Sequence, residues 1–255
     1  MKANCFIPFI TKDLDEMIPS ALNDPFETTI PKICEIAANE LQNYLLQQQD
    51  NWMHNFGTAE EVNKKGPIKG KMFGVLVVKN EFGELGYLST YSGKIADVES
   101  PQIFVPSLFD ITTNDNFITK GMRKITEMNN EIKKLKAEAA DGYLDEIEKL
   151  KFARKEHSIK LQEALFDQYV FLNKSGEQKS LFTIFDEYNA IKPAAGSGEC
   201  AAPKLLHYAF RHELKPLAIA EFWWGQSNPS EVKVHQSFYP ACNDKCRPIL
   251  GFMLG

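Results

Sequence analysis

Residues 71–93 read KMFGVLVVKNEFGELGYLSTYSG, and this stretch decides the fold. Two runs rich in β-branched and aromatic residues flank the turn sequence NEFG at 80–83, where the glycine suits a tight turn. The first run, from Phe73 to Val78, is almost continuously apolar, which is typical of a strand covered on both faces. We therefore expect a β-hairpin whose first arm lies in the centre of a sheet.

Helical patterns lie on both sides of this hairpin. Residues 31–52 carry apolar side chains at helical spacing, and Pro31 suits the first turn of a helix. Towards the other end of the chain we expect a helix over about 202–212 and a strand over 217–223. A Cys-bearing turn then opens a last helix near Pro248.

Residues 114–168 differ in character, because they are rich in Lys and Glu. Asp141-Gly142 divides them into two apolar series, which predict an antiparallel helical hairpin of roughly 25 residues per arm. Such a hairpin is interpreted as a spacer or a dimerisation arm, with direct contact to a substrate such as RNA as the alternative. The first series advances in alternating steps of three and four, as a coiled-coil seam does, through Met122, Ile125, Met128, Ile132, Leu135 and Ala139.

Together these patterns predict an α+β or α/β fold. A small mixed sheet with flanking helices is interrupted by the long antiparallel helical hairpin. Residues 1–113 and 169–255 form one α/β domain in this prediction, and residues 114–168 are the inserted hairpin.

Composition excludes several classes of protein. The 255 residues carry a formal net charge of −5 with a pI of about 5.6, so the molecule as a whole is not a polycation that coats nucleic acid. No stretch approaches the roughly 18 apolar residues that span a bilayer. The N-terminal segment lacks the small-residue cleavage site of a signal peptide. We therefore expect a cytoplasmic protein with no membrane partner.

The five cysteines are too few and too unevenly spaced for a disulfide framework. Two of them lie in apolar surroundings and are interpreted as ordinary buried thiols. Cys200 and His207 stand two helical turns apart in CAAPKLLH, while Cys242 and Cys246 lie close together in CNDKC. Zinc prefers thiolate and imidazole ligands and usually takes four of them. These four residues therefore predict a zinc site, with buried structural thiols as the alternative.

The order of elements and thiols resembles that of zinc deaminases. In those enzymes a Cys or His, followed two residues later by a catalytic Glu, opens one helix, and Pro-Cys-x-x-Cys opens the next. Here Cys200 opens a helix, and PACNDKC at 240–246 precedes another. Two departures argue against an active enzyme, because Ala202 stands where the Glu is expected and the second Cys pair has one extra residue. The resemblance therefore implies a deaminase-like fold without activity.

A second resemblance covers most of the chain. The segments GSGECAAPKLLHYAFRHELKPLAIAEFWWG at 196–225 and FYPACNDKCRPILGFMLG at 238–255 resemble the region upstream of the catalytic domain in long bacterial pseudouridine synthases of the large-subunit rRNA and tRNA type. The hairpin at 73–95 and YVFLNKSGEQKSLFTIFDEY at 169–188 resemble that region in the same order. The family isomerises uridine with an Asp in an Arg-Leu-Asp motif, which this sequence lacks. The resemblance implies a fragment, an accessory N-terminal region without its catalytic domain, that binds RNA or positions a substrate.

This resemblance directs attention to the last quarter of the chain as the surface for rRNA or tRNA. Trp224 is a candidate for stacking on an unpaired base, although alternate members of AIAEFWWG also suit the core of a strand. Basic side chains in the same quarter offer contacts to phosphate, namely Lys204, Arg211, Lys245 and Arg247.

Three functions stay open from the sequence. The first is an RNA-binding or substrate-positioning module of a pseudouridine synthase. The second is a zinc-binding, deaminase-like domain, and the third is a structural module whose helical hairpin joins two chains as a homodimer. Ala202 favours the first over the second, and nothing in the sequence separates the first from the third.

Overall fold

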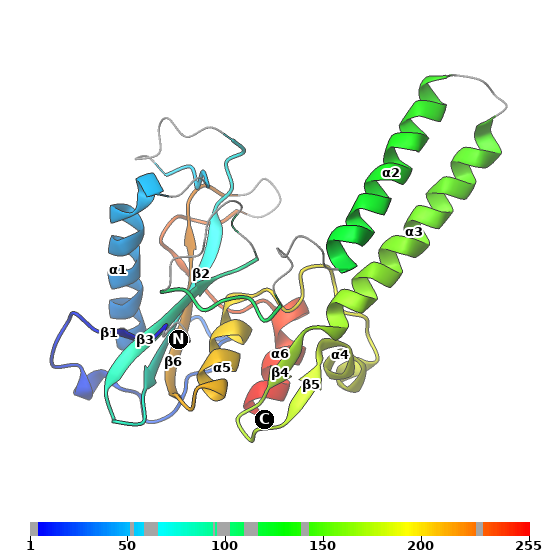
Figure 1. Cartoon of the computed structure of the whole chain (residues 1–255). Coiled ribbons are helices and arrows are strands. Elements are labelled where there is room, and N and C mark those ends of the chain that lie inside the picture. The colour runs from blue at the N-terminus through cyan, green and yellow to red at the C-terminus, as the bar shows by residue number, and fades with distance from the viewer. Residues whose placement is uncertain are drawn as a thin grey trace.

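A five-stranded sheet forms the centre of the molecule, helices cover both of its faces, and a pair of long helices projects from one side (Figure 1). The predicted α+β class is confirmed. Within the described residues, none of the helices combines the length and the apolarity needed to cross a bilayer. The computed structural model describes residues 5–51, 54–58, 66–93, 95, 103–109, 117–138, 143–227 and 232–255.

The sheet is built around the predicted hairpin. β2 (Lys71–Lys79) and β3 (Leu85–Tyr91) pair in antiparallel, and Gly83 in the turn has a φ of 79°, which favours glycine. β6 (Lys215–Trp224) pairs with the other edge of β2, so β2 is central, as predicted. The sheet has the order β1-β3-β2-β6-β7 and is completed by two short outer strands, β1 (Ile7–Pro8) and β7 (Phe238–Tyr239).

The sequence predicts a mixed sheet, but all pairings between these strands are antiparallel. β6 runs parallel to β3 and lies on the far side of β2, so the two parallel strands are not neighbours. Among the described residues, parallel pairing is limited to the isolated bridge between Ser89 and Phe104. β4 (Val170–Leu172) and β5 (Gln178–Ser180) form a separate two-stranded sheet.

The two faces of β2 carry different helical layers. Val75 and Val77 pack in the cluster that contains α1 (Lys32–Gln47), whereas Leu76 and Val78 pack in the cluster formed with the helices of the opposite face. All four side chains are fully buried. This double burial explains why the strand is apolar at almost every position instead of at every second one.

The opposite face is covered by α5 (Ala201–Arg211), with α6 (Asn243–Leu254) packed beside it. The sequence predicts that α6 opens near Pro248, but the helix starts at Asn243 and Pro248 lies inside it. The amide of Cys246 donates to the carbonyl of Cys242 over 3.2 Å, and this bond closes the first turn. Cys246 is therefore a helical residue and Cys242 is the N-cap.

α2 (Phe117–Ala137) and α3 (Leu144–Asp167) form the predicted antiparallel helical hairpin, with arms of 21 and 24 residues. Ile132, Leu135 and Ile147 make up its buried seam. Beyond α3 the chain returns through β4 and β5 to α4 (Leu181–Asn189), which packs against α6.

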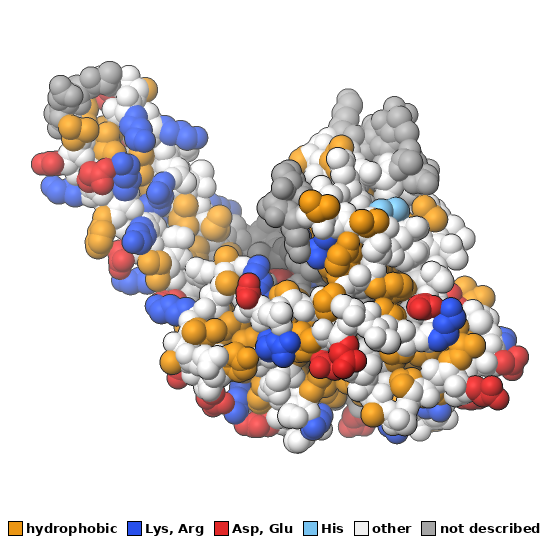
Figure 2. Space-filling model, turned by 180° about the vertical axis from the view of Figure 1, so that it is seen from behind, with side chains coloured by type: hydrophobic (Ala, Val, Ile, Leu, Met, Phe, Trp, Pro, Cys, Tyr) orange, Lys and Arg blue, Asp and Glu red, His pale blue; other side chains and the backbone are white. Residues whose placement is uncertain are grey.

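The seam differs from the prediction at one position. Met122 is 52% exposed, and Gly121 is buried in its place, because the Leu161 side chain fills the space that a Cβ at 121 would need. Ala139 and the turn at 141–142 lie outside the described residues. On the face seen in Figure 2, basic, acidic and apolar side chains alternate along the hairpin, as on any solvated helix pair. The homodimer through this hairpin stays a prediction.

Gly74 in β2 tests the contact between the sheet and α5. A methyl group at this position would lie 2.9 Å from the Cβ of Ala201 and 3.1 Å from the Cδ1 of Leu205. We predict that Gly74→Ala lowers the free energy of unfolding, measured in urea, by about 1–3 kcal/mol, because overpacking pushes α5 off the strand.

Gly251→Ala in α6 is the matched control, because nothing lies within 4 Å of the added methyl group. It should be neutral or stabilising by up to about 1 kcal/mol, since alanine favours a helix over glycine. Equal losses in the two variants would contradict the close approach of α5 to β2.

Candidate metal centre and cavity

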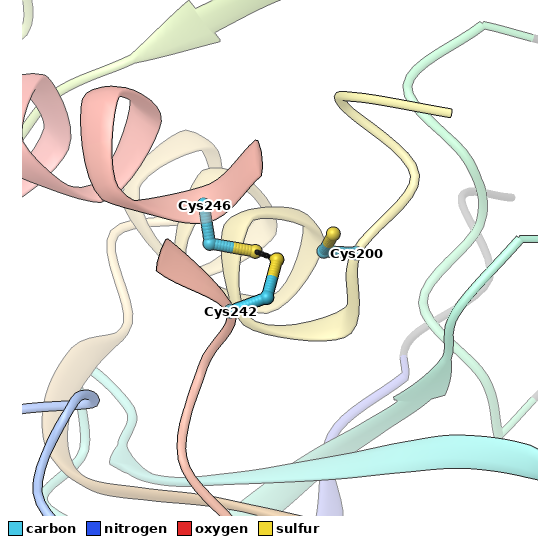
Figure 3. A group of neighbouring side chains, drawn as sticks. All are labelled: Cys200, Cys242 and Cys246. Atoms are coloured by element: carbon cyan, nitrogen blue, oxygen red, sulfur yellow. Dashed lines mark hydrogen bonds between the residues drawn. The ribbon is translucent and has the colours of Figure 1, made fainter. Parts of the chain in front are cut away.

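Three of the five cysteines meet at the starts of α5 and α6 (Figure 3). Cys200 is the N-cap of α5, Cys242 is the N-cap of α6, and Cys246 lies in the first turn of α6. Their sulfur atoms all lie within 4.8 Å of one another, and those of Cys242 and Cys246 are 3.3 Å apart. Thiolates around a tetrahedral zinc, with Zn–S bonds of about 2.3 Å, are separated by about 3.8 Å. The three sulfurs could therefore hold a single metal ion.

The ends of two helices make this corner favourable for negative charge. The first amide groups of a helix have no helical acceptors and carry a partial positive charge, which stabilises a thiolate placed beside them. Neither Cys200 nor Cys242 caps its helix with a side-chain hydrogen bond, so both sulfurs remain available to a metal.

The thiols share their protons unevenly. Hydrogen bonds with Cys200 and Cys246 and with the backbone amides of Lys245 and Cys246 lower the pKa of the Cys242 thiol to about 2, in spite of burial. The hydrogen bond with Cys242 and burial raise the pKa of Cys200, and hydrogen bonds with both other thiols and burial raise that of Cys246. Cys242 therefore loses its proton most readily, and a metal would have to displace the protons of the other two.

The three cysteines line a cavity of about 710 Å³. This volume lies within the range of about 300–1,000 Å³ that is usual for small-molecule sites. Its apolar wall consists of Met72, Trp223 and Pro240. Its charged wall consists of Lys69, Lys71, Lys233, Lys245, Glu199, Glu221 and Asp244.

Glu221 brings a carboxyl group from β6 to this cavity. Its side chain is 6% exposed, and its Oε1 accepts a hydrogen bond from the amide of Ala202 over 2.9 Å. Burial, together with the charge of Cys242, raises the pKa of this carboxyl to about 7 in spite of that hydrogen bond. Glu221 is not among the residues predicted for the site, although one acid in the apolar run AIAEFWWG is a signal for it.

Glu199 also lines the cavity, but its hydrogen bonds position the backbone before Cys200. Its carboxylate accepts hydrogen bonds from the hydroxyl groups of Tyr169 and Ser107, and its carbonyl accepts one from the amide of Gly93 over 2.8 Å. These contacts hold the residue that precedes Cys200 and so fix the entry into α5.

His207, the predicted fourth ligand, does not join the sulfurs. Seven residues bring two side chains to the same face of a helix but leave them about 10.5 Å apart along its axis, which is too far for one ion. Instead, His207 Nδ1 accepts the amide proton of Leu172 over 3.1 Å, and the ring meets Phe171 edge to face. In the described part of the chain, the group of close ligand atoms consists of the three cysteines.

Two of the predicted RNA contacts are buried. Lys204 is 1% exposed and donates through Nζ to the carbonyl of Tyr91 over 2.5 Å. Trp224 is 3% exposed, with its ring against that of His235. Both side chains are buried within the fold, so neither reaches a surface where RNA could bind.

The other predicted contacts are accessible. Arg211 is exposed at the end of α5, and Arg247 is exposed on α6, where its guanidinium group lies 4.0 Å from the centre of the Phe26 ring. Lys245 is half-buried in the wall of the cavity.

Comparisons with protein-family models, with curated proteins and with solved structures found no match. Function is therefore inferred from the cavity and its side chains.

His207 yields a prediction about pH. Burial, together with the charges of Arg211 and His212, lowers its pKa to about 4 from the usual 6.5. The unfolded chain therefore takes up this proton first, so His207 contributes fully to stability above about pH 6.5, and the contribution is lost as the pH falls towards 4.

We predict that His207→Asn, whose amide oxygen can still accept the Leu172 amide proton, loses less stability than the native chain between pH 6.5 and 4 in thermal unfolding. Its zinc content should equal that of the native chain, because the imidazole is not a ligand. Loss of zinc in this variant would show that His207 is a ligand of the metal.

Proposed function

We propose that this chain binds one zinc ion through Cys200, Cys242 and Cys246, and that the metal forms part of the wall of a ligand-binding cavity. The observation that carries the proposal is the meeting of three sulfurs within 4.8 Å at the border of the 710 Å³ cavity. A structural zinc site is normally closed by four protein ligands, whereas a catalytic or ligand-binding site has three and an open position. Three thiols beside a cavity match the second kind.

The ligand class follows from the order of elements. α1, the β2–β3 hairpin, α5, β6 and α6 occur in the order expected of a cytidine-deaminase-like fold, with thiols at the starts of α5 and α6. On this basis the cavity accepts a nucleobase or nucleoside. Zinc bound by three thiolates would supply a Lewis acid at its open position.

Glu221 offers the acid–base group that catalysis in this cavity would need. Ala202, at the position expected for the acid–base Glu, has a fully buried methyl group, and its amide instead binds the Glu221 carboxylate. A carboxyl whose pKa is about 7 can hold or release a proton at neutral pH. Glu221 thus brings an acid–base group to the cavity from β6, whereas the deaminase pattern would place this group on α5.

A second candidate function is the RNA-binding accessory region of a pseudouridine synthase. Its basis is the sequence resemblance, and the observation that favours it is the set of cavity lysines, which suit a phosphate backbone. Arg211 and Arg247 are exposed and can extend such a surface, but Lys204 and Trp224 are excluded from it by burial. In this function one nucleotide of the RNA would insert into the cavity, instead of the RNA lying across a flat face.

Zinc binding has a direct test. We expect about one equivalent of zinc per chain by elemental analysis, falling at least tenfold in occupancy when Cys200, Cys242 or Cys246 is changed to Ser and excess metal is removed. Cys34→Ala is the control, because Cys34 lies on α1 and is fully buried in the core on the other face of the sheet, away from the cluster. Unchanged zinc content in all three Ser variants would refute the assignment.

A second experiment separates the two candidate functions. Zinc-loaded protein with cytidine or adenosine should release ammonia if the cavity is catalytic, and Glu221→Gln should reduce the rate at least about 100-fold, because it removes the acid–base group. The accessory RNA function predicts no ammonia and a tRNA or rRNA affinity that falls steeply with salt. Ammonia release that Glu221→Gln leaves unchanged would exclude Glu221 from the chemistry.

A further inference from the structure

Lysine side chains reach the cavity from separate parts of the chain. Lys69 and Lys71 come from the start of β2, Lys233 from the segment before β7, and Lys245 from the first turn of α6. Four cations thus reach one cavity of a chain whose net charge is −5. Glu199, Glu221 and Asp244 line the same cavity, so an anionic ligand is favoured only at the edge where lysine side chains gather.

Two of these lysines point to the same edge. The Nζ of Lys71 lies 3.6 Å from the place where a Cβ on Gly93 would be, and the Nζ of Lys245 lies 3.5 Å from the corresponding place on Gly196. The two glycine segments are joined by the hydrogen bond from the Gly93 amide to the Glu199 carbonyl. Both glycines have φ values in the left-handed region, 63° and 79°, and both line the cavity without a side chain that would fill it.

The charge at this edge is concentrated. Lys71 is 8% exposed, and burial together with the charges of Lys69 and Lys204 lowers its pKa to about 8, although the charge of Glu199 acts in the opposite direction. A phosphate bound at this edge would accept charged hydrogen bonds in a poorly solvated place, where such bonds are strong. The Glu199 carboxylate nearby already accepts hydrogen bonds from Tyr169 and Ser107.

We propose that the edge formed by Lys71, Lys245, Gly93 and Gly196 binds the phosphate of a nucleoside monophosphate whose base extends towards the three cysteines. This inference rests on the proposed metal cavity and adds the form of its ligand. A volume of about 710 Å³ accommodates a nucleotide, and Trp223 offers an apolar wall for the base.

The test is calorimetric titration of the zinc-loaded chain with cytidine 5′-monophosphate, cytidine and inorganic phosphate. We expect the monophosphate to bind at least about tenfold more tightly than cytidine, because charged hydrogen bonds to its phosphate add to the contacts of the base. Inorganic phosphate should compete with the monophosphate. Equal affinities for nucleotide and nucleoside would overturn the proposal.

Lys71→Met and Lys245→Met should each weaken monophosphate binding at least about tenfold and leave cytidine binding unchanged. Lys215→Met is the control, because Lys215 is exposed at the start of β6 and does not line the cavity. Lys245 is half-buried at the edge of a helix, so its variant decides the matter even if Lys71→Met fails to fold. An effect of the control equal to that of Lys245→Met would also overturn the proposal.

Zinc content measured on the same samples separates the two proposals. Bound zinc without preference for the monophosphate refutes the phosphate subsite alone. A chain without zinc refutes the metal cavity, and in that case the same titration of the metal-free chain still decides the subsite through Lys245→Met.

Discussion

The close packing of α5 on β2 is the contact on which the rest of the structure depends. Gly74 lets Ala201 approach the strand to a distance that any side chain at 74 would prevent. The first turn of α5 is thereby held over β6, where Glu221 accepts the amide proton of Ala202. Cys200, at the start of the same helix, is brought to the sulfurs of α6 because the two helices share one core.

The three sulfurs come together only in the folded chain. Cys242 and Cys246 are close in sequence, but Cys200 joins them through the packing of two helices, so the binding of a metal ion here would be linked to the free energy of folding. The projecting hairpin is connected to the same place. Tyr169 follows α3 directly and donates to Glu199, the residue before Cys200. The chain that returns from the hairpin thus helps to position the first ligand.

Features with a local signal can be predicted from the sequence. Periodicity and turn residues indicate the hairpin at 71–93, the helix after Cys200 and the strand ending in EFWW, and short spacing indicates that the thiols of Cys242 and Cys246 are close. The positions of side chains that depend on tertiary packing could not be predicted. His207 has the right helical face but lies two turns away, and Lys204 and Trp224 have the right chemistry but are buried. Glu221 went unnoticed because its role depends on α5, which approaches it only in the fold.

We propose above all that three thiolates hold a zinc ion whose fourth position faces the cavity. X-ray absorption spectroscopy of the zinc-loaded chain tests it most directly, because it counts the atoms bound to the metal. Three sulfur atoms at about 2.3 Å and one oxygen or nitrogen atom at about 2.0 Å are predicted. A shell of four sulfur atoms, or a spectrum of zinc surrounded by oxygen alone, would exclude coordination by three thiolates with one open position.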